Sequence, residues 1–255
     1  MLKQITLAIL FVLGFSIAAT GQSLRPTAAV SHAGNGPLTT ESERALARLG
    51  DLSSDAVRRR LTGMRPPAYQ AGPLLLNEII KRQQLIVCAS ERVERLKVAL
   101  QPVLAYHDRD GKLPIIVIRS EQPKAFVVVR AALIITSKLM LITSEAEIRG
   151  IVAHELAHEY LWDEREQAIK ANDESLLREI ELFCDVVAAL SLKAIGDDPA
   201  HFGRALKRMT CVGVMAGITT RSETKTHPSL DARVKLNQWL CGQLGQARRQ
   251  RADKN

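Results

Sequence analysis

Several features that define whole classes of protein are scarce in this 255-residue sequence. The longest apolar stretch, residues 5–18, falls short of the roughly 20 residues that span a bilayer. A second apolar stretch, residues 125–142, is interrupted by Arg130 and Lys138, and its β-branched residues predict strands instead of a membrane helix. No internal repeat is visible. We therefore expect the mature protein to be soluble.

Cysteine is also scarce. The four cysteines are Cys88, Cys184, Cys211 and Cys241, and none is spaced C-x-x-C, which argues against a cysteine-based zinc site. In an oxidising compartment they could form two disulfides, with three possible pairings. Cys88 and Cys184 lie in helical patterns, where small buried hydrophobic residues are equally expected. Both interpretations stay open at this point.

Aromatic residues make up only 4% of the sequence, and the net charge of +8 is diffuse. The densest basic segments are residues 58–60 and the tail, residues 246–255. Neither has the interleaved aromatic residues typical of nucleic-acid binding, so we expect no nucleic-acid partner and a solvated, disordered tail. Membrane association is expected only through an uncleaved N-terminus or this tail.

The N-terminal segment, residues 1–21, has one lysine, then an apolar stretch, then small residues. This order is typical of a secretory signal peptide, and it predicts an exported protein, periplasmic or secreted. The alternative is an uncleaved membrane anchor. Residues 22–72 are rich in Pro, Gly, Ser, Thr and Ala, so we expect a flexible arm or pro-segment with one short helix near 41–62.

The remaining residues, 73–245, predict an α+β domain in which a small sheet packs against several helices. A capping box at Ser144 predicts the start of one helix. The predicted strands are residues 113–120 and 124–136, and the predicted helices are 73–107, 144–161, 174–195, 199–216 and 228–244.

The segment GIVAHELAHEYL, residues 150–161, places His154, Glu155 and His158 in a helix that is otherwise apolar. Unpaired polar groups are costly in such a helix, and a shared metal ion would remove that cost. Histidines four residues apart lie on one face of a helix and can bind one zinc ion, with the intervening glutamate as general base. We therefore predict one zinc ion per chain.

A catalytic zinc ion needs a third protein ligand. Glu181 and Asp185 are spaced i, i+4 on a later apolar helix, which predicts Glu181 as that ligand. Asp185 is then expected to accept a hydrogen bond from the second ring nitrogen of a ligand histidine. The alternatives are an exposed acidic stripe, or Glu174 or Glu179 as the ligand. The other histidines, His32, His107 and His201, have no partner pattern and are interpreted as surface residues.

Three motifs in order, AHELAHEYL, EIELFCD and THPSLDAR, resemble HExxH, ExxxD and HPxxxxR of metallopeptidase family M48. This family of zinc gluzincins includes CAAX prenyl proteases and the HtpX, Oma-type and BepA-type proteases. The segment KAFVVVRAALIITSKLM resembles the family's edge strand, although Arg130 and Ala131 stand where many members have two glycines. The membrane helices of the prenyl and heat-shock members have no counterpart here.

The resemblance implies a zinc metalloendopeptidase in which Glu155 moves the proton. It also implies roles for His227, as a transition-state stabiliser or a regulatory fourth ligand, and for Arg233, which would support the substrate or the acidic motif. The expected substrates are unfolded or misfolded polypeptides that add as a strand near residues 125–136. The alternatives are a chaperone or binding module with this fold but no activity, and a membrane-surface protein that uses its basic ends.

Overall fold

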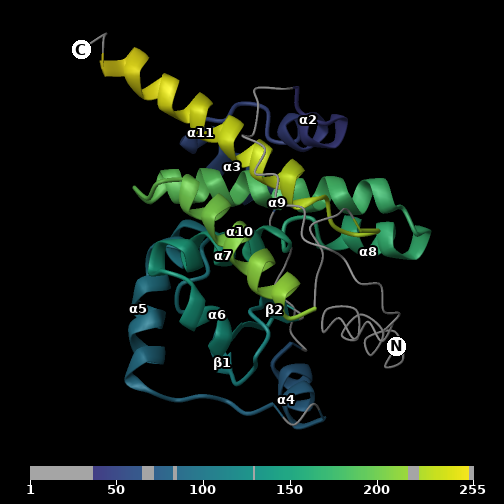
Figure 1. Ribbon diagram of the computed structural model, residues 1–255, viewed down its shortest axis with the longest axis vertical. Helices are drawn as coiled ribbons and strands as arrows, with labels where there is room; N and C mark the ends of the chain where they lie inside the picture. Colours follow the sequence, from purple (N-terminus) through teal and green to yellow (C-terminus); the bar gives the residue numbers. More distant parts are fainter. Residues whose placement is uncertain (1–36, 65–71, 83–84, 129, 218–223, 253–255) are drawn as a thin grey trace. The chain divides into compact units, whose positions relative to one another are not determined.

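The computed structural model describes residues 37–64, 72–82, 85–128, 130–217 and 224–252 (Figure 1). The predicted α+β class is confirmed, because helices surround one small three-stranded sheet. The N-terminal elements are α2 (Thr40–Ala47), α3 (Ser54–Met64), α4 (Gly72–Arg82) and α5 (Glu91–Tyr106). The sheet contains β1 (Ile115–Ile118), β2 (Ala125–Val128) and β3 (Ala132–Thr136). The remaining helices are α6 (Ser137–Ile142), α7 (Glu145–Ala157), α8 (Trp162–Ala171), α9 (Glu174–Ala194), α10 (Ala200–Met215) and α11 (Leu230–Ala252).

The sheet has the order β1-β3-β2, with β1 parallel and β2 antiparallel to the central strand. The stretch expected to be a single strand, residues 124–136, is therefore a hairpin. Arg130 has a φ of 56°, which turns the chain, and the Ala131 N–H donates to the Val128 carbonyl. The hairpin leaves β2 at the edge, whereas β3 lies in the middle of the sheet.

The single long helix predicted for residues 73–107 is wrong, because the chain leaves helical structure between α4 and α5. Val87 forms a bridge with Ile118, and the Cys88 N–H donates to the Val117 carbonyl, so this segment pairs with β1. Ser90 then begins α5 by accepting a hydrogen bond from the Val93 N–H. The β-branched residues before Ser90 favour extended structure, and the serine cap begins a new helix, so the first helix does not continue.

Helix α7 begins as predicted. The Ser144 side chain accepts from the Glu147 N–H, and the Glu147 carboxylate accepts from the Ser144 N–H. The helix ends at Ala157, earlier than expected, with His158 as its C-cap. The charged segment that follows forms α8, which ends at Ala171 and is capped by Asn172 in the left-handed conformation.

Helix α9 lies between two hydrophobic clusters of side chains. Ala188 and Leu192 face the first cluster, which also contains side chains from α5, the sheet, α7 and α10. Phe183 and Val187 face the second, which contains side chains from α2, α3 and α11. Because both sides of α9 are covered, every residue from Ile180 to Leu192 is buried. The helix is therefore held firmly along most of its length.

Residues 37–64 differ from the expected flexible arm. They form α2 and α3, whose buried residues Ala45, Leu49, Val57 and Leu61 pack in the second cluster with α9. The apolar positions in this segment recur at helical spacing, and the Pro- and Gly-rich composition of the wider segment concealed them. The predicted signal peptide lies outside the described residues.

Three further expectations are corrected or decided. His107 is not a surface residue, because it is 1% exposed and lies 2.8 Å from the Tyr160 hydroxyl and 2.9 Å from the Ser191 hydroxyl. The four cysteines form no disulfide. The tail expected to be disordered continues α11 as far as Ala252. Within the described residues, no helix combines the length and the apolar character of a membrane span.

Candidate metal centre

The candidate metal centre lies where α7 packs against α9. His154 and His158 come from the last turn of α7 and its C-cap, and Glu181 comes from the second turn of α9. Phe202 of α10 stacks on the His154 ring with 5.8 Å between ring centroids. Gly150, one turn before His154, allows this approach, because a Cβ atom there would lie 3.1 Å from the Phe202 Cβ.

Three donor groups converge at this point. The Nε2 atom of His154 lies 3.4 Å from one Glu181 oxygen, and the Nε2 atom of His158 lies 3.5 Å from the other. One ligand atom from each residue lies within 4.8 Å of the others. Donors that share a zinc ion at about 2 Å lie roughly 3–4 Å apart, so this spacing suits such an ion. The structure thus brings together the three residues predicted as ligands.

The two imidazoles lie in different electrostatic environments. Burial lowers the pKa of His158 to about 3, so its ring is neutral near pH 7, the form that ligates a metal. Burial also acts to lower the pKa of His154, but the carboxylates of Asp185 and Glu181 outweigh it and raise the pKa to about 9. Glu181 itself is buried, yet the three surrounding histidines hold the pKa of its carboxyl well below the usual range.

The charge of Glu181 supports a cation at this position. The carboxylate is 4% exposed, and its contacts at ion-pair distance within the described chain are His154, His158 and His227. No lysine or arginine of that part lies at salt-bridge distance from it. Buried carboxylates are costly without a cation, and two imidazoles with one carboxylate form a donor set that zinc accepts. The residues therefore fit the predicted metal.

Glu155 lies on α7 directly after His154 and is partly exposed. Burial, and to a smaller extent the nearby Glu181 carboxylate, raise the pKa of its carboxyl to about 7, against the opposing effect of His154. A carboxylate with a pKa near the working pH can both accept and donate a proton. This environment is suited to the general-base role expected from the motif.

Asp185 and Arg233 form a buried pair beside the donor groups. The guanidinium of Arg233 donates two hydrogen bonds of 2.8 and 2.6 Å to the Asp185 carboxylate. Asp185 Oδ1 also lies 2.9 Å from His154 Nδ1, at ion-pair distance but without the alignment of a hydrogen bond. Burial acts to raise the pKa of Asp185, and Arg233 and His154 outweigh it and hold that pKa below its usual value.

His227 approaches the centre from the segment that precedes α11. Its Nε2 atom lies 3.7 Å from Glu181 Oε1, while its side chain remains 53% exposed. The Thr226 hydroxyl lies 2.7 Å from Nδ1, which supports the ring from the side away from the centre. The structure thus places His227 within reach of the three donor groups without burying it.

The two competing acids of α9 face other partners. Glu179 is bound by Arg44 and Arg48 of the α2 region at 2.7 Å each. Glu174 lies near the start of α9, where Lys225 is 3.4 Å from its carboxylate. Neither belongs to the group of converging donors. The position of α2, which the sequence did not reveal, is what separates Glu179 from the centre.

A comparison with known protein families agrees with the geometry. The family model of peptidase family M48 matches residues 90–181, from the cap of α5 to Glu181. This matched segment belongs to peptidase family M48. It is therefore assigned to a family of metallopeptidases, as the HExxH motif within it predicted. No curated protein matches the chain.

One departure from the M48 pattern has a clear structural consequence. Arg130 occupies a left-handed backbone conformation, which glycine adopts without strain and other residues adopt at a cost of about 1 kcal/mol. The Arg130 guanidinium lies over the Trp162 ring, 5.7 Å from its centroid. This contact joins the β2–β3 turn to the start of α8.

Cys184 lies beside the candidate centre, although the M48 motifs did not indicate it. Its Sγ atom lies 3.4 Å from His158 Nδ1, and the thiol is fully buried. Burial raises the pKa of this thiol well above its usual value. The available signal was its spacing from Glu181, because residues i and i+3 share a helix face.

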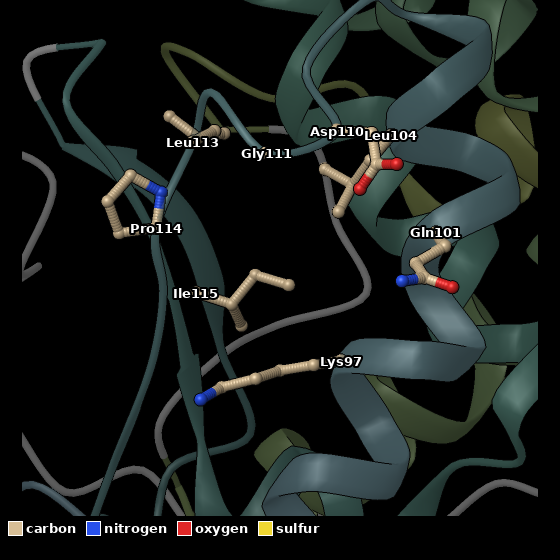
Figure 2. A pocket seen from close by; sticks show the side chains of 8 residues that line it. All are labelled: Lys97, Gln101, Leu104, Asp110, Gly111, Leu113, Pro114 and Ile115. Carbon is tan, nitrogen blue, oxygen red and sulfur yellow. The ribbon is translucent and has the colours of Figure 1, made fainter.

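The structure also contains a hollow of about 320 Å³ between α5 and the segment leading into β1 (Figure 2). Lys97 and Gln101 line it from the helix, and Pro114 and Ile115 line it from the opposite side. None of the converging donor residues of the M48 centre contributes to this hollow. We therefore assign it no part in the chemistry.

Proposed function

We propose that this protein is a zinc-dependent endopeptidase that hydrolyses unfolded or misfolded polypeptides after export from the cytoplasm. The observation that carries the proposal is the convergence of His154, His158 and Glu181 with Glu155 beside them. His154, His158 and Glu181 would hold one zinc ion. When bound, zinc supplies Lewis-acid activation of water and of the scissile carbonyl.

The protein's own residues perform the proton transfer. Glu155 removes a proton from the attacking water and later delivers it to the leaving amine, in the general acid–base role of its motif. Asp185 holds the ring of His154 from the side opposite Glu181, and Arg233 keeps Asp185 in place. This contact favours the second of the two roles expected for Arg233, which is support of the acidic motif.

The free edge of the sheet supports unfolded polypeptides as the proposed substrates. Strand β2 is an edge strand that packs against α7, so an extended chain paired with β2 would run along the helix that carries Glu155. Only a segment free of its own secondary structure can add in this way. Unfolded or misfolded chains satisfy that requirement, whereas folded proteins expose such segments rarely.

The proposal is tested by incubating the purified protein with reduced casein and with unstructured peptides. We expect cleavage that a chelator abolishes and that added zinc restores. Glu155→Gln should keep its zinc but lose activity by a factor of about 10²–10⁴, since only the proton-transfer group is removed. Glu174→Gln, an acid of α9 outside the centre, is the matched control and should cleave at the wild-type rate.

Two results would contradict the proposal. Cleavage by Glu155→Gln at the wild-type rate would show that this residue is not the base. Binding of casein by the zinc-loaded protein without any cleavage would favour the alternative of a chaperone that retains the peptidase fold.

A further inference from the structure

Helix α9 presents three polar side chains to the histidines of α7. They are Glu181, Cys184 and Asp185, at positions i, i+3 and i+4, which share one face of a helix. Glu181 lies between the two Nε2 atoms, and Asp185 lies against Nδ1 of His154. Cys184 occupies the corresponding position at the other histidine, against Nδ1 of His158.

The two ring nitrogens of His158 therefore have separate partners. Nε2 faces Glu181 at 3.5 Å, and Nδ1 faces the Cys184 sulfur at 3.4 Å. A histidine that binds a metal through Nε2 carries its proton on Nδ1, and that proton needs an acceptor. A sulfur atom 3.4 Å from the nitrogen satisfies the distance for such a bond.

We propose that Cys184 is a positioning residue for the metal, because its sulfur accepts the Nδ1 proton of His158 and thereby holds Nε2 toward the ion. This inference rests on the proposed zinc site. The pair of adjacent residues Cys184 and Asp185 then orients both ligand histidines from a single turn of α9. Because position 184 holds a thiol and not a further carboxylate, no third negative charge lies beside Glu181 and Asp185, where burial destabilises charged groups.

The test measures zinc affinity by competition with a chelator whose affinity for zinc is known. We expect Cys184→Ala to bind zinc about tenfold more weakly, as is typical when an outer partner of a ligand histidine is lost. Cys184→Ser keeps an acceptor at the same place and should recover part of the lost affinity. Cys211→Ala, an exposed cysteine of α10, is the control and should match the wild type.

A second measurement separates positioning from direct coordination. The protein is loaded with cobalt in place of zinc, and its visible and near-ultraviolet absorption is recorded. We expect no thiolate-to-cobalt charge-transfer band in the wild type, and a changed visible spectrum in Cys184→Ala. A charge-transfer band that disappears in this variant would overturn the inference, because Cys184 would then be a ligand.

Three outcomes of the zinc-affinity measurement would contradict the proposed role of Cys184. Equal affinity of wild type and Cys184→Ala would overturn the positioning role while leaving the zinc site intact. Equal losses in the Ala and Ser variants would mean that packing, not the acceptor, is responsible. If the wild type bound no zinc, the proposed site and this inference would both fail.

Discussion

Arg233 contacts the candidate metal centre only through Asp185. Its two hydrogen bonds keep the Asp185 carboxylate ionised in a position that is 1% exposed. An ionised Asp185 can attract the Nδ1 proton of His154, whereas a protonated one could not. The stabilising contribution of Asp185 is therefore present above its unfolded pKa and is lost as the pH falls through the depressed folded value.

His227 has two expected roles that one activity measurement distinguishes. It reaches Glu181 at 3.7 Å from an exposed segment, so it could approach the metal as a fourth ligand and occupy the position that water needs. We expect His227→Ala to raise the basal rate of peptide hydrolysis, because this ligand would then be missing. The measurement is the initial rate on an unstructured peptide, with zinc content determined in parallel.

A different outcome would assign His227 another role. A lower rate with unchanged zinc content would identify it as a stabiliser of the transition state. An unchanged rate would reject both roles. His201→Ala is a suitable control, since His201 interacts with Arg204 of its own helix, α10.

At the scale of elements, α9 connects the centre to the N-terminal helices. It supplies Glu181 on the α7 side and Glu179 on the α2 side, two residues apart. Arg44 and Arg48 neutralise Glu179, and Arg48 also binds Glu164 of α8. Helices α2 and α3 are therefore part of the domain that positions the proposed metal ligands.

This arrangement predicts the effect of N-terminal truncation. A chain that begins at Gly72 lacks α2 and α3, so it leaves Glu179 without its guanidinium partners and exposes Phe183 and its neighbours. We expect a loss of at least about 3 kcal/mol in the free energy of unfolding, because each large apolar side chain that loses its burial costs about 1.5–3 kcal/mol. Urea unfolding measures the loss, and a chain that begins at Pro37 is the control.

A point variant tests the same contact on a smaller scale. Arg48→Ala should lower the free energy of unfolding by roughly 1–3 kcal/mol, because the buried Glu179 loses a partner. Arg95→Ala removes an exposed i, i+4 pair with Glu91 and should cost less than about 0.5 kcal/mol.

The truncation experiment has a contrary outcome. If the truncated chain were as stable as the control and more active, residues 37–71 would instead be an inhibitory pro-segment.

At the scale of the whole molecule, the net charge of +8 and the N-terminal segment bear on where the protein acts. The expectation of export rests on residues 1–21, which lie outside the described part of the chain. Within that part, no helix is suited to crossing a membrane. Export would bring the proposed peptidase into contact with chains that have left the cytoplasm unfolded.

The export hypothesis predicts where the mature chain begins. N-terminal sequencing of the protein recovered from an expressing cell should find a start between Ala19 and Gln22, because small residues follow the apolar stretch there. An intact N-terminus in the membrane fraction would indicate an anchor instead. Replacing residues 8–13 with a polar sequence is the control, and it should keep the full-length chain in the cytoplasm.

Much of the centre could be predicted from the sequence, because its signals are local. The i, i+4 spacing of His154 and His158, and of Glu181 and Asp185, determines which side chains share a helix face. The capping box at Ser144 determined where the histidine helix begins. Both signals depend only on the geometry of one helix, so they do not require knowledge of its neighbours.

Only the tertiary structure decided which groups meet across elements. Glu179 and Glu181 are both acids of α9. Helix α2 packs on one side of α9, so Glu179 binds arginines there, whereas Glu181 faces the histidines of α7. His107 became a buried residue because α5 ends beside Tyr160 and Ser191. Cys184 gained its contact with His158 only when α7 and α9 came together, since contacts between distant segments depend on packing and not on local spacing.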